Sequence, residues 1–94
     1  MDKNSIMIIL KDYLEEDDDN CAILHFNDGS ELLIYNVPTF FNLIMSVKVY
    51  REFGEDKIEE KIHIPYSSII YITTSNRNNL KIAYYYQYNI MQEE

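Results

Sequence analysis

Residues 21–37 read CAILHFNDGSELLIYNV, two apolar runs on either side of the polar turn Asn27-Asp28-Gly29. A tight reversal at Asp-Gly requires a positive φ angle, which glycine adopts without a Cβ clash. The stretch therefore predicts a β-hairpin with strands at 21–26 and 31–37. Pro38 is expected to end the second strand, because proline has no N–H to donate to a strand ladder.

A second hairpin is predicted directly after the first. Between residues 43 and 53, apolar and polar side chains alternate with the period of two that is typical of a half-buried strand. A turn around Gly54-Glu55-Asp56 leads into a return strand at 58–64. The polar turn 65–68 then leads into a short strand at 69–73.

A last strand is predicted at residues 80–90. Its apolar face consists of Leu80, Ile82, Tyr84, Tyr86, Tyr88 and Ile90. This face must be buried, either inside the domain or, through an exposed strand edge, against a neighbouring subunit or partner, and both alternatives stay open. The tyrosines are expected in a core or interface, with base stacking as the alternative role.

A short amphipathic helix is predicted at residues 5–14, capped by Asn4 or Ser5. Its apolar positions, at Ile6, Ile9, Leu10, Tyr13 and Leu14, follow the spacing of one helical face. The run 6–10 is also compatible with a strand, since periodicity does not separate the two structures over so short a stretch.

The chain has 94 residues, enough for one domain, and a formal charge of −8. Eight acidic residues lie between Asp12 and Glu31 without a lysine or arginine, so the charge is polarised along the chain. This balance disfavours nonspecific nucleic-acid binding and favours basic protein surfaces. The single Cys21 and the lack of a membrane-length apolar run predict a cytoplasmic protein without disulfides.

Three motifs resemble an Sm or Lsm domain of the Hfq-like kind. Residues 23–29 are similar to the first Sm strand and its turn, residues 41–45 to the Asn-containing run that opens the third strand, and residues 64–72 to the tight turn into the closing strand. The resemblance implies a small barrel and RNA contact through Phe40, Phe41, Asn42 and Tyr66. Three positions depart from the family pattern: Ile34, Pro38, and Pro65-Tyr66 where Arg-Gly is usual.

The sequence offers no positive sign of catalysis. Cys21 and His25 are about 13 Å apart along a strand, too far to form a dyad. The acidic run at 15–19 lacks the spaced ligands and the glycine of a calcium loop. Phosphate loops and nucleophile elbows are also missing, so we expect neither an enzyme nor a metal or other cofactor.

Together these patterns predict a mainly β, α+β domain spanning residues 1–94: a small Sm-like or SH3-like antiparallel barrel with an N-terminal helix and an added C-terminal strand. The leading hypothesis for function is an acidic interaction module that docks on a basic surface of a nucleic-acid-handling protein, analogous in charge and size to phage inhibitors acting in the host cytoplasm. Its acidic face comprises Glu15, Glu16, Asp17, Asp18, Asp19, Glu55, Asp56, Glu59 and Glu60. The alternative is an Sm-like ring subunit that binds or processes RNA.

Overall fold

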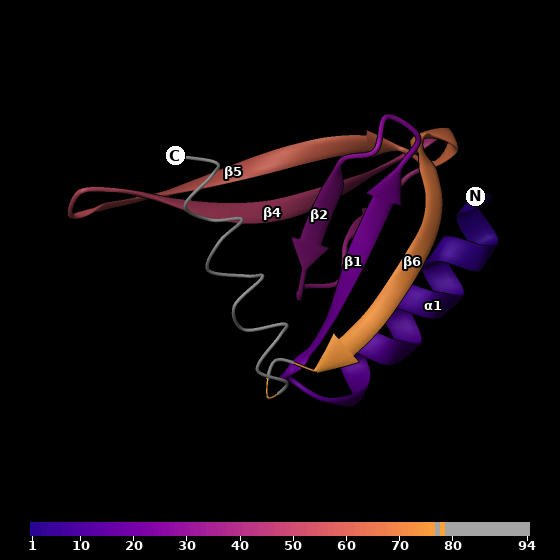
Figure 1. The fold of residues 1–94 in the computed structure, drawn as a ribbon, viewed down its shortest axis with the longest axis horizontal. Helices are drawn as coiled ribbons and strands as arrows, with labels where there is room; N and C mark the ends of the chain where they lie inside the picture. Colours follow the sequence, from indigo (N-terminus) through magenta and orange to yellow (C-terminus); the bar gives the residue numbers. More distant parts are fainter. Residues whose placement is uncertain (77, 79–94) are drawn as a thin grey trace.

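The computed structural model describes residues 1–76 and 78, and in them one helix and six antiparallel strands form an α+β fold (Figure 1). The elements are α1 (Lys3–Glu16), β1 (Asn20–Phe26), β2 (Glu31–Ile34), β3 (Thr39–Phe40), β4 (Ile44–Phe53), β5 (Asp56–Pro65), the 3-10 turn η1 (Tyr66–Ser68) and β6 (Ile69–Asn76). Two three-stranded sheets have the orders β2-β1-β6 and β3-β4-β5. The mainly β prediction with an N-terminal helix is confirmed. The strand predicted at 80–90 lies outside the described residues.

Helix α1 resolves the ambiguity at residues 6–10 in favour of a helix. Its cap is Asp2, and not Asn4 or Ser5 as predicted: the Asp2 carboxylate accepts hydrogen bonds from the Ser5 N–H (2.8 Å) and the Ser5 hydroxyl (3.1 Å). These bonds hold the pKa of Asp2 below its usual 3.8. The earlier cap lets the helix begin one turn before its first buried residue, Ile6.

The first hairpin has the predicted turn but a shorter second strand. Gly29 takes a φ of +88°, and the Phe26 N–H donates to the Ser30 carbonyl (2.9 Å). Strand β2 ends at Ile34 and not at Val37, because the chain leaves this sheet there and pairs in the other sheet as β3. The buried Pro38 lies in that crossing segment.

The second hairpin is a long two-stranded ribbon. Strands β4 and β5 pair continuously from Ile44 opposite Pro65 to Phe53 opposite Asp56. Gly54, with a φ of +62°, opens the two-residue turn. The return strand is thus longer than the predicted 58–64, because so tight a turn lets pairing start immediately after it.

Strand β6 closes the order of the first sheet. The turn before it is held by Ser68, whose hydroxyl donates to the Pro65 carbonyl (2.7 Å). Strand β6 then pairs antiparallel with β1 as far as Asn76 opposite Asn20, three residues beyond the predicted end.

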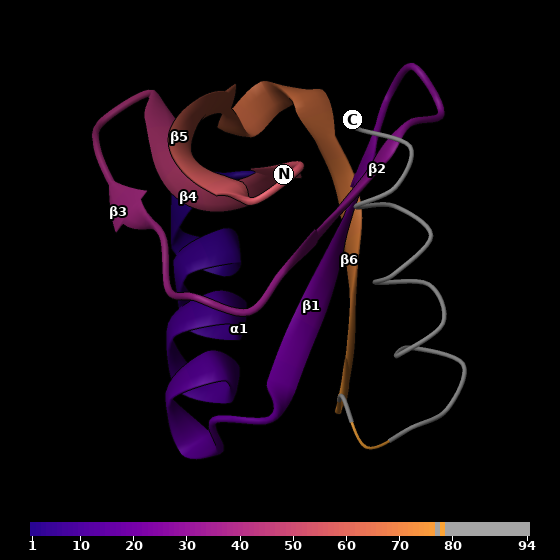
Figure 2. The same ribbon diagram turned by 90° about the vertical axis from the view of Figure 1, so that its left-hand side faces the viewer.

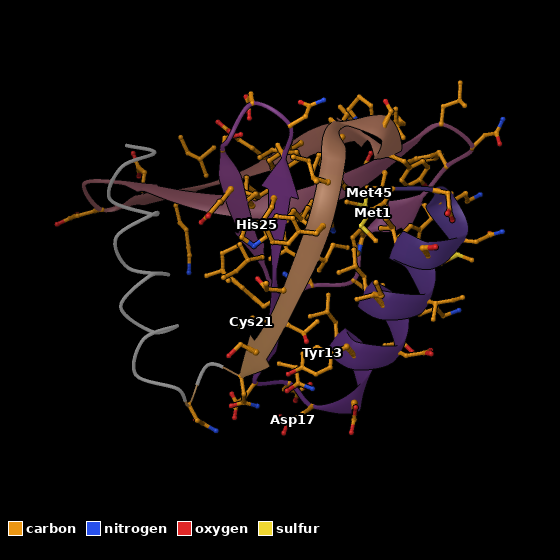
Figure 3. The ribbon with its side chains drawn as sticks, turned by 45° about the vertical axis from the view of Figure 1, so that its right-hand side comes forward. Met1, Tyr13, Asp17, Cys21, His25 and Met45 are labelled. Carbon is orange, nitrogen blue, oxygen red and sulfur yellow. The ribbon has the colours of Figure 1, made fainter. Side chains whose placement is uncertain are left out.

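One core joins the helix and both sheets. In Figure 2, α1 runs beside β1 and below the β4-β5 ribbon. The buried cluster comprises Ile6, Leu10, Leu14, Ala22, Leu24, Ile34, Met45, Val47, Ile64, Tyr66 and Ile69. At the opposite end of α1 from Asp17, the Met1 amino group donates to the Ile69 carbonyl at 2.6 Å (Figure 3). In the described part of the chain, no helix has the length and apolar character needed to cross a membrane.

Candidate functional site

The acidic connector, residues 15–19, is held in a compact turn at the end of α1 (Figure 3). The Asp17 carboxylate accepts a hydrogen bond from the Asp19 N–H (2.8 Å). The next residue, Asn20, is buried; its Nδ2 donates to the Tyr13 carbonyl (2.9 Å), and its Oδ1 accepts from Asn76 Nδ2 (2.9 Å). Asn20 thereby satisfies one of the last carbonyls of the helix and fixes the connector to β1 and β6.

The charges of α1 oppose its dipole. The last turn carries the exposed Glu15 and Glu16 and no basic residue, while the helix begins with Lys3 and has no acid in its first turn. Since the C-terminal end of a helix is partially negative, an acid there destabilises it by about 0.3–1 kcal/mol. These two glutamates therefore do not contribute to helix stability.

A shallow hollow of about 520 Å³ lies beside the acidic connector. It is lined by Leu14, Glu15, Asp18, Tyr35, Asn36 and Val37. Two carboxylates thus stand next to apolar and aromatic surface. A lysine or arginine from a partner could lay its aliphatic stem on that surface and bring its charge to the carboxylates.

The acidic hairpin, residues 55–60, lies elsewhere. Figure 1 shows its tip projecting away from the α1–β1 connection, and Figure 2 places the two at opposite levels of the molecule. Glu59 forms an ion pair with Lys48 (3.5 Å), and Glu60 is half-buried, whereas Glu55 and Asp56 are exposed. The structure therefore does not join the two acidic segments into the single face that we predicted.

The predicted RNA-contact residues gather where the 41–43 turn meets η1. The Tyr66 hydroxyl donates to the Phe41 carbonyl (2.7 Å), and the Tyr66 N–H donates to the Leu43 carbonyl (3.3 Å). Tyr66 is buried, which raises the pKa of its hydroxyl. Phe40 is half-buried against the core, while Phe41 and Asn42 are exposed. Of these four, only Phe41 and Asn42 are therefore exposed to a ligand.

The outward face of β3-β4-β5 forms a groove of about 310 Å³ that no pattern in the sequence predicts. It is lined by Thr39, Phe41, Ile44, Ser46, Lys48, Lys61 and His63. Strand pairing places Ser46 opposite His63 and Lys48 opposite Lys61. The alternation of apolar and polar residues predicts that these side chains lie on the polar faces of their strands. Only the pairing register of β4 with β5 shows that they are neighbours.

The outward face of β1 and β6 carries a different polar cluster. His25 lies between Thr73 (Nε2 to Oγ1, 3.0 Å) and Glu31 (Nδ1 to Oε1, 3.3 Å), and its ring stacks on Tyr71 with centroids 4.0 Å apart. Cys21 is buried, and its thiol lies 3.5 Å from the Ser75 carbonyl. Cys21 and His25 thus have separate structural partners.

In residues 1–76 and 78, no three His, Cys, Asp or Glu side chains are grouped so that they could hold a metal ion. Burial raises the pKa of Tyr13 at the end of α1, with smaller contributions from the nearby carboxylates of Glu16 and Asp17. The chain matches no protein-family model, and no curated protein or solved structure is significantly similar to it.

Proposed function

We propose that this protein is a non-enzymatic interaction module whose acidic connector docks on a basic surface of another protein. The observation that carries the proposal is the hollow at the end of α1, where Glu15 and Asp18 stand beside Leu14 and Val37. Such a surface suits the long basic side chains of a partner, which need both an apolar support and a carboxylate.

The charge of the chain favours the same class of partner. A net charge of −8 accelerates encounter with a basic surface and slows encounter with polyanions. Proteins that handle nucleic acids have basic surfaces, and closely spaced carboxylates can occupy them as phosphates do. By analogy of charge and size, we propose an inhibitor of such a protein, of the kind that phages produce in the cytoplasm of their host.

The acidic hairpin is a second contact only for a partner large enough to reach both segments. It carries Lys57 among its acids, Lys61 follows directly after them, and Glu59 already pairs with Lys48. The acidic connector is therefore expected to supply most of the electrostatic attraction.

The experiment begins with gentle purification from the native host and native mass spectrometry, which identifies the bound protein. Its affinity is then measured with Asp17, Asp18 and Asp19 all replaced by asparagine. Asparagine keeps the side-chain oxygen that the Asp19 N–H contacts, so the turn is preserved while the charge is lost. We expect affinity to fall by about tenfold at low salt, and its salt dependence to flatten.

The matched control replaces Glu55 with glutamine and Asp56 with asparagine, which removes exposed acids from the hairpin tip. This variant should retain most of the affinity. An unchanged affinity of the triple variant, with a normal circular dichroism spectrum, would contradict docking through the acidic connector.

The junction of the 41–43 turn with η1 favours a second candidate function, an Sm-like subunit that contacts RNA. It brings together residues 41–45 and 64–72, two of the three segments that resemble Sm motifs. Among the described strands, β5 and β6 each pair on one side only, so either edge could join a neighbouring subunit. A ring carrying RNA in the native mass spectrum, with RNA lost in Asn42→Ala, would support this candidate; a protein purified without RNA would contradict it.

A further inference from the structure

We propose that the outward groove of β3-β4-β5 binds a nucleoside phosphate, with the phosphate between Lys48 and Lys61 and the base against Phe41. This site lies apart from the acidic connector and does not depend on docking to a basic protein.

The two lysines define the anionic end of the site. Lys48 and Lys61 face each other directly across β4 and β5, a like-charge pair that destabilises a sheet unless an anion lies between them. Glu59 lies 3.5 Å from Lys48 and offsets one of the two charges. Among the described residues no carboxylate forms an ion pair with Lys61, so the pair keeps a net positive charge.

The middle of the groove is polar and ordered. The Ser46 hydroxyl and His63 Nδ1 are hydrogen-bonded at 2.6 Å, which fixes the imidazole ring. Nδ1 is occupied by this bond, so Nε2 is the ring nitrogen left to meet a ligand. Thr39, opposite Ser46 on β3, adds a second hydroxyl. These groups suit the hydroxyls of a ribose.

The far end of the groove is apolar. Phe41 is 50% exposed and lies beside Ile44, and its main chain is held by two hydrogen bonds: its N–H donates to the Ile44 carbonyl (2.9 Å), and its carbonyl accepts from the Tyr66 hydroxyl (2.7 Å). An exposed, positioned aromatic ring is a surface on which any base can stack.

The order of these groups matches the order of groups in the ligand. From Ile44 through Ser46 to Lys48, the strand advances about 13 Å, and the lining changes from apolar to hydroxyl and imidazole to cationic. A nucleoside 5′-phosphate presents base, ribose and phosphate in that sequence. The ligand carries a single phosphate group at the site, so it avoids most of the repulsion that the net charge of −8 exerts on a polyanion.

The test is a titration of the ¹⁵N-labelled full chain, in which binding is measured from the amide chemical shifts in NMR spectra. Uridine 5′-monophosphate, uridine, inorganic phosphate and a six-residue oligouridylate are added separately. We expect the monophosphate to shift amides of Phe41, Ser46, Lys48, Lys61 and His63, and to bind more tightly than uridine or phosphate alone. If the oligonucleotide binds at least ten times more tightly than the monophosphate at these amides, the natural source is an RNA strand; equal affinity indicates a free nucleotide.

Two variants, each with its own control, separate the two ends of the site. Replacing both Lys48 and Lys61 with glutamine should lower nucleotide affinity by roughly tenfold or more, while Lys11→Gln on α1 should leave it unchanged. Phe41→Ala should lower nucleotide affinity by about fivefold or more without changing the affinity for inorganic phosphate, whereas the exposed Leu43→Ala should change neither. No shifts with any probe, or binding that survives the double lysine variant, would overturn the proposal.

Discussion

The outward faces of the two sheets each carry a histidine, and the two histidines have opposite surroundings. His25 on β1 is contacted by Thr73, Glu31 and the Tyr71 ring, so its polar atoms are used within the fold. His63 on β5 bonds only to Ser46 among the described residues and faces a groove. Polar groups that contact one another contribute to structure, whereas polar groups that converge on a groove without mutual neutralisation are available to a ligand.

The inward faces of the same two sheets do not differ in this way. Leu24 on β1 and Met45 on β4 are both fully buried in one cluster with α1. Function and stability can therefore be separated by face: inward substitutions in either sheet should lower the stability of the fold, and outward ones should lower it markedly only in β2-β1-β6.

The largest expected effect tests the shared core. Leu24→Ala and Met45→Ala should each lower the free energy of unfolding by about 2–5 kcal/mol, because each removes a fully buried side chain and leaves a cavity. Urea denaturation followed by circular dichroism measures both. The control is Leu43→Ala, at a position 77% exposed, with an expected change within about 0.5 kcal/mol. A silent Met45→Ala would show that β3-β4-β5 does not share the core.

The next effect compares the two histidines directly. His25→Ala should lower the free energy of unfolding by about 1–2 kcal/mol, since it removes two polar contacts and a ring stack. His63→Ala should lower it by less than about 0.5 kcal/mol, as expected for an exposed position. Equal losses in the two variants, measured by the same denaturation, would remove the distinction between the faces.

Local signals in the sequence were sufficient for most of the fold. Asp28-Gly29 and Gly54 each indicate a reversal of the chain. The alternation of apolar and polar residues on either side of these turns predicts the strands and the side chains that face inward. The early end of β2 was not predictable from the apolar run 31–37, because the chain changes sheets there to satisfy a tertiary arrangement. The Asp2 cap was not predicted either: Asp2, Asn4 and Ser5 all belong to residue types that cap helices well, so residue type alone does not choose among them.

The candidate sites were less predictable, because they depend on which strands meet. The groove needs the register that opposes Lys48 to Lys61, which follows only once the turn at Gly54 is known to contain two residues. The division of the acidic residues into two separate surfaces depends on the direction in which the β4-β5 ribbon projects, and no local pattern encodes that direction.

A smaller effect concerns the residue that positions the edge of the groove. Tyr66→Phe should lower the free energy of unfolding by about 0.5–1.5 kcal/mol, because the Phe41 carbonyl loses its 2.7 Å hydrogen bond. Thermal denaturation measures the loss. In the nucleotide titration, Tyr66→Phe should also weaken binding, although Tyr66 does not line the groove. A variant with the same stability and the same affinity would show that this hydrogen bond does not hold the 41–43 turn.

The smallest effect is a pH dependence of two carboxylates that serve the fold. Asp2 and Asp28 each accept hydrogen bonds from a serine N–H and hydroxyl, and these bonds lower both pKa values from 3.8. A group with a lowered pKa in the folded state stabilises the protein above its unfolded pKa, and this contribution disappears as the pH falls through the folded value. The matched variant has asparagine at both positions. We expect the native chain to exceed this variant in free energy of unfolding by a constant amount above about pH 5, and by a declining amount below pH 3.8. Urea midpoints measured from pH 7 to pH 2 test this, because every other acid is shared by the two proteins. A difference that does not change with pH would show that the ionisation of Asp2 and Asp28 contributes nothing to the stability of the fold. His25 would then be the clearer case of a polar group committed to structure.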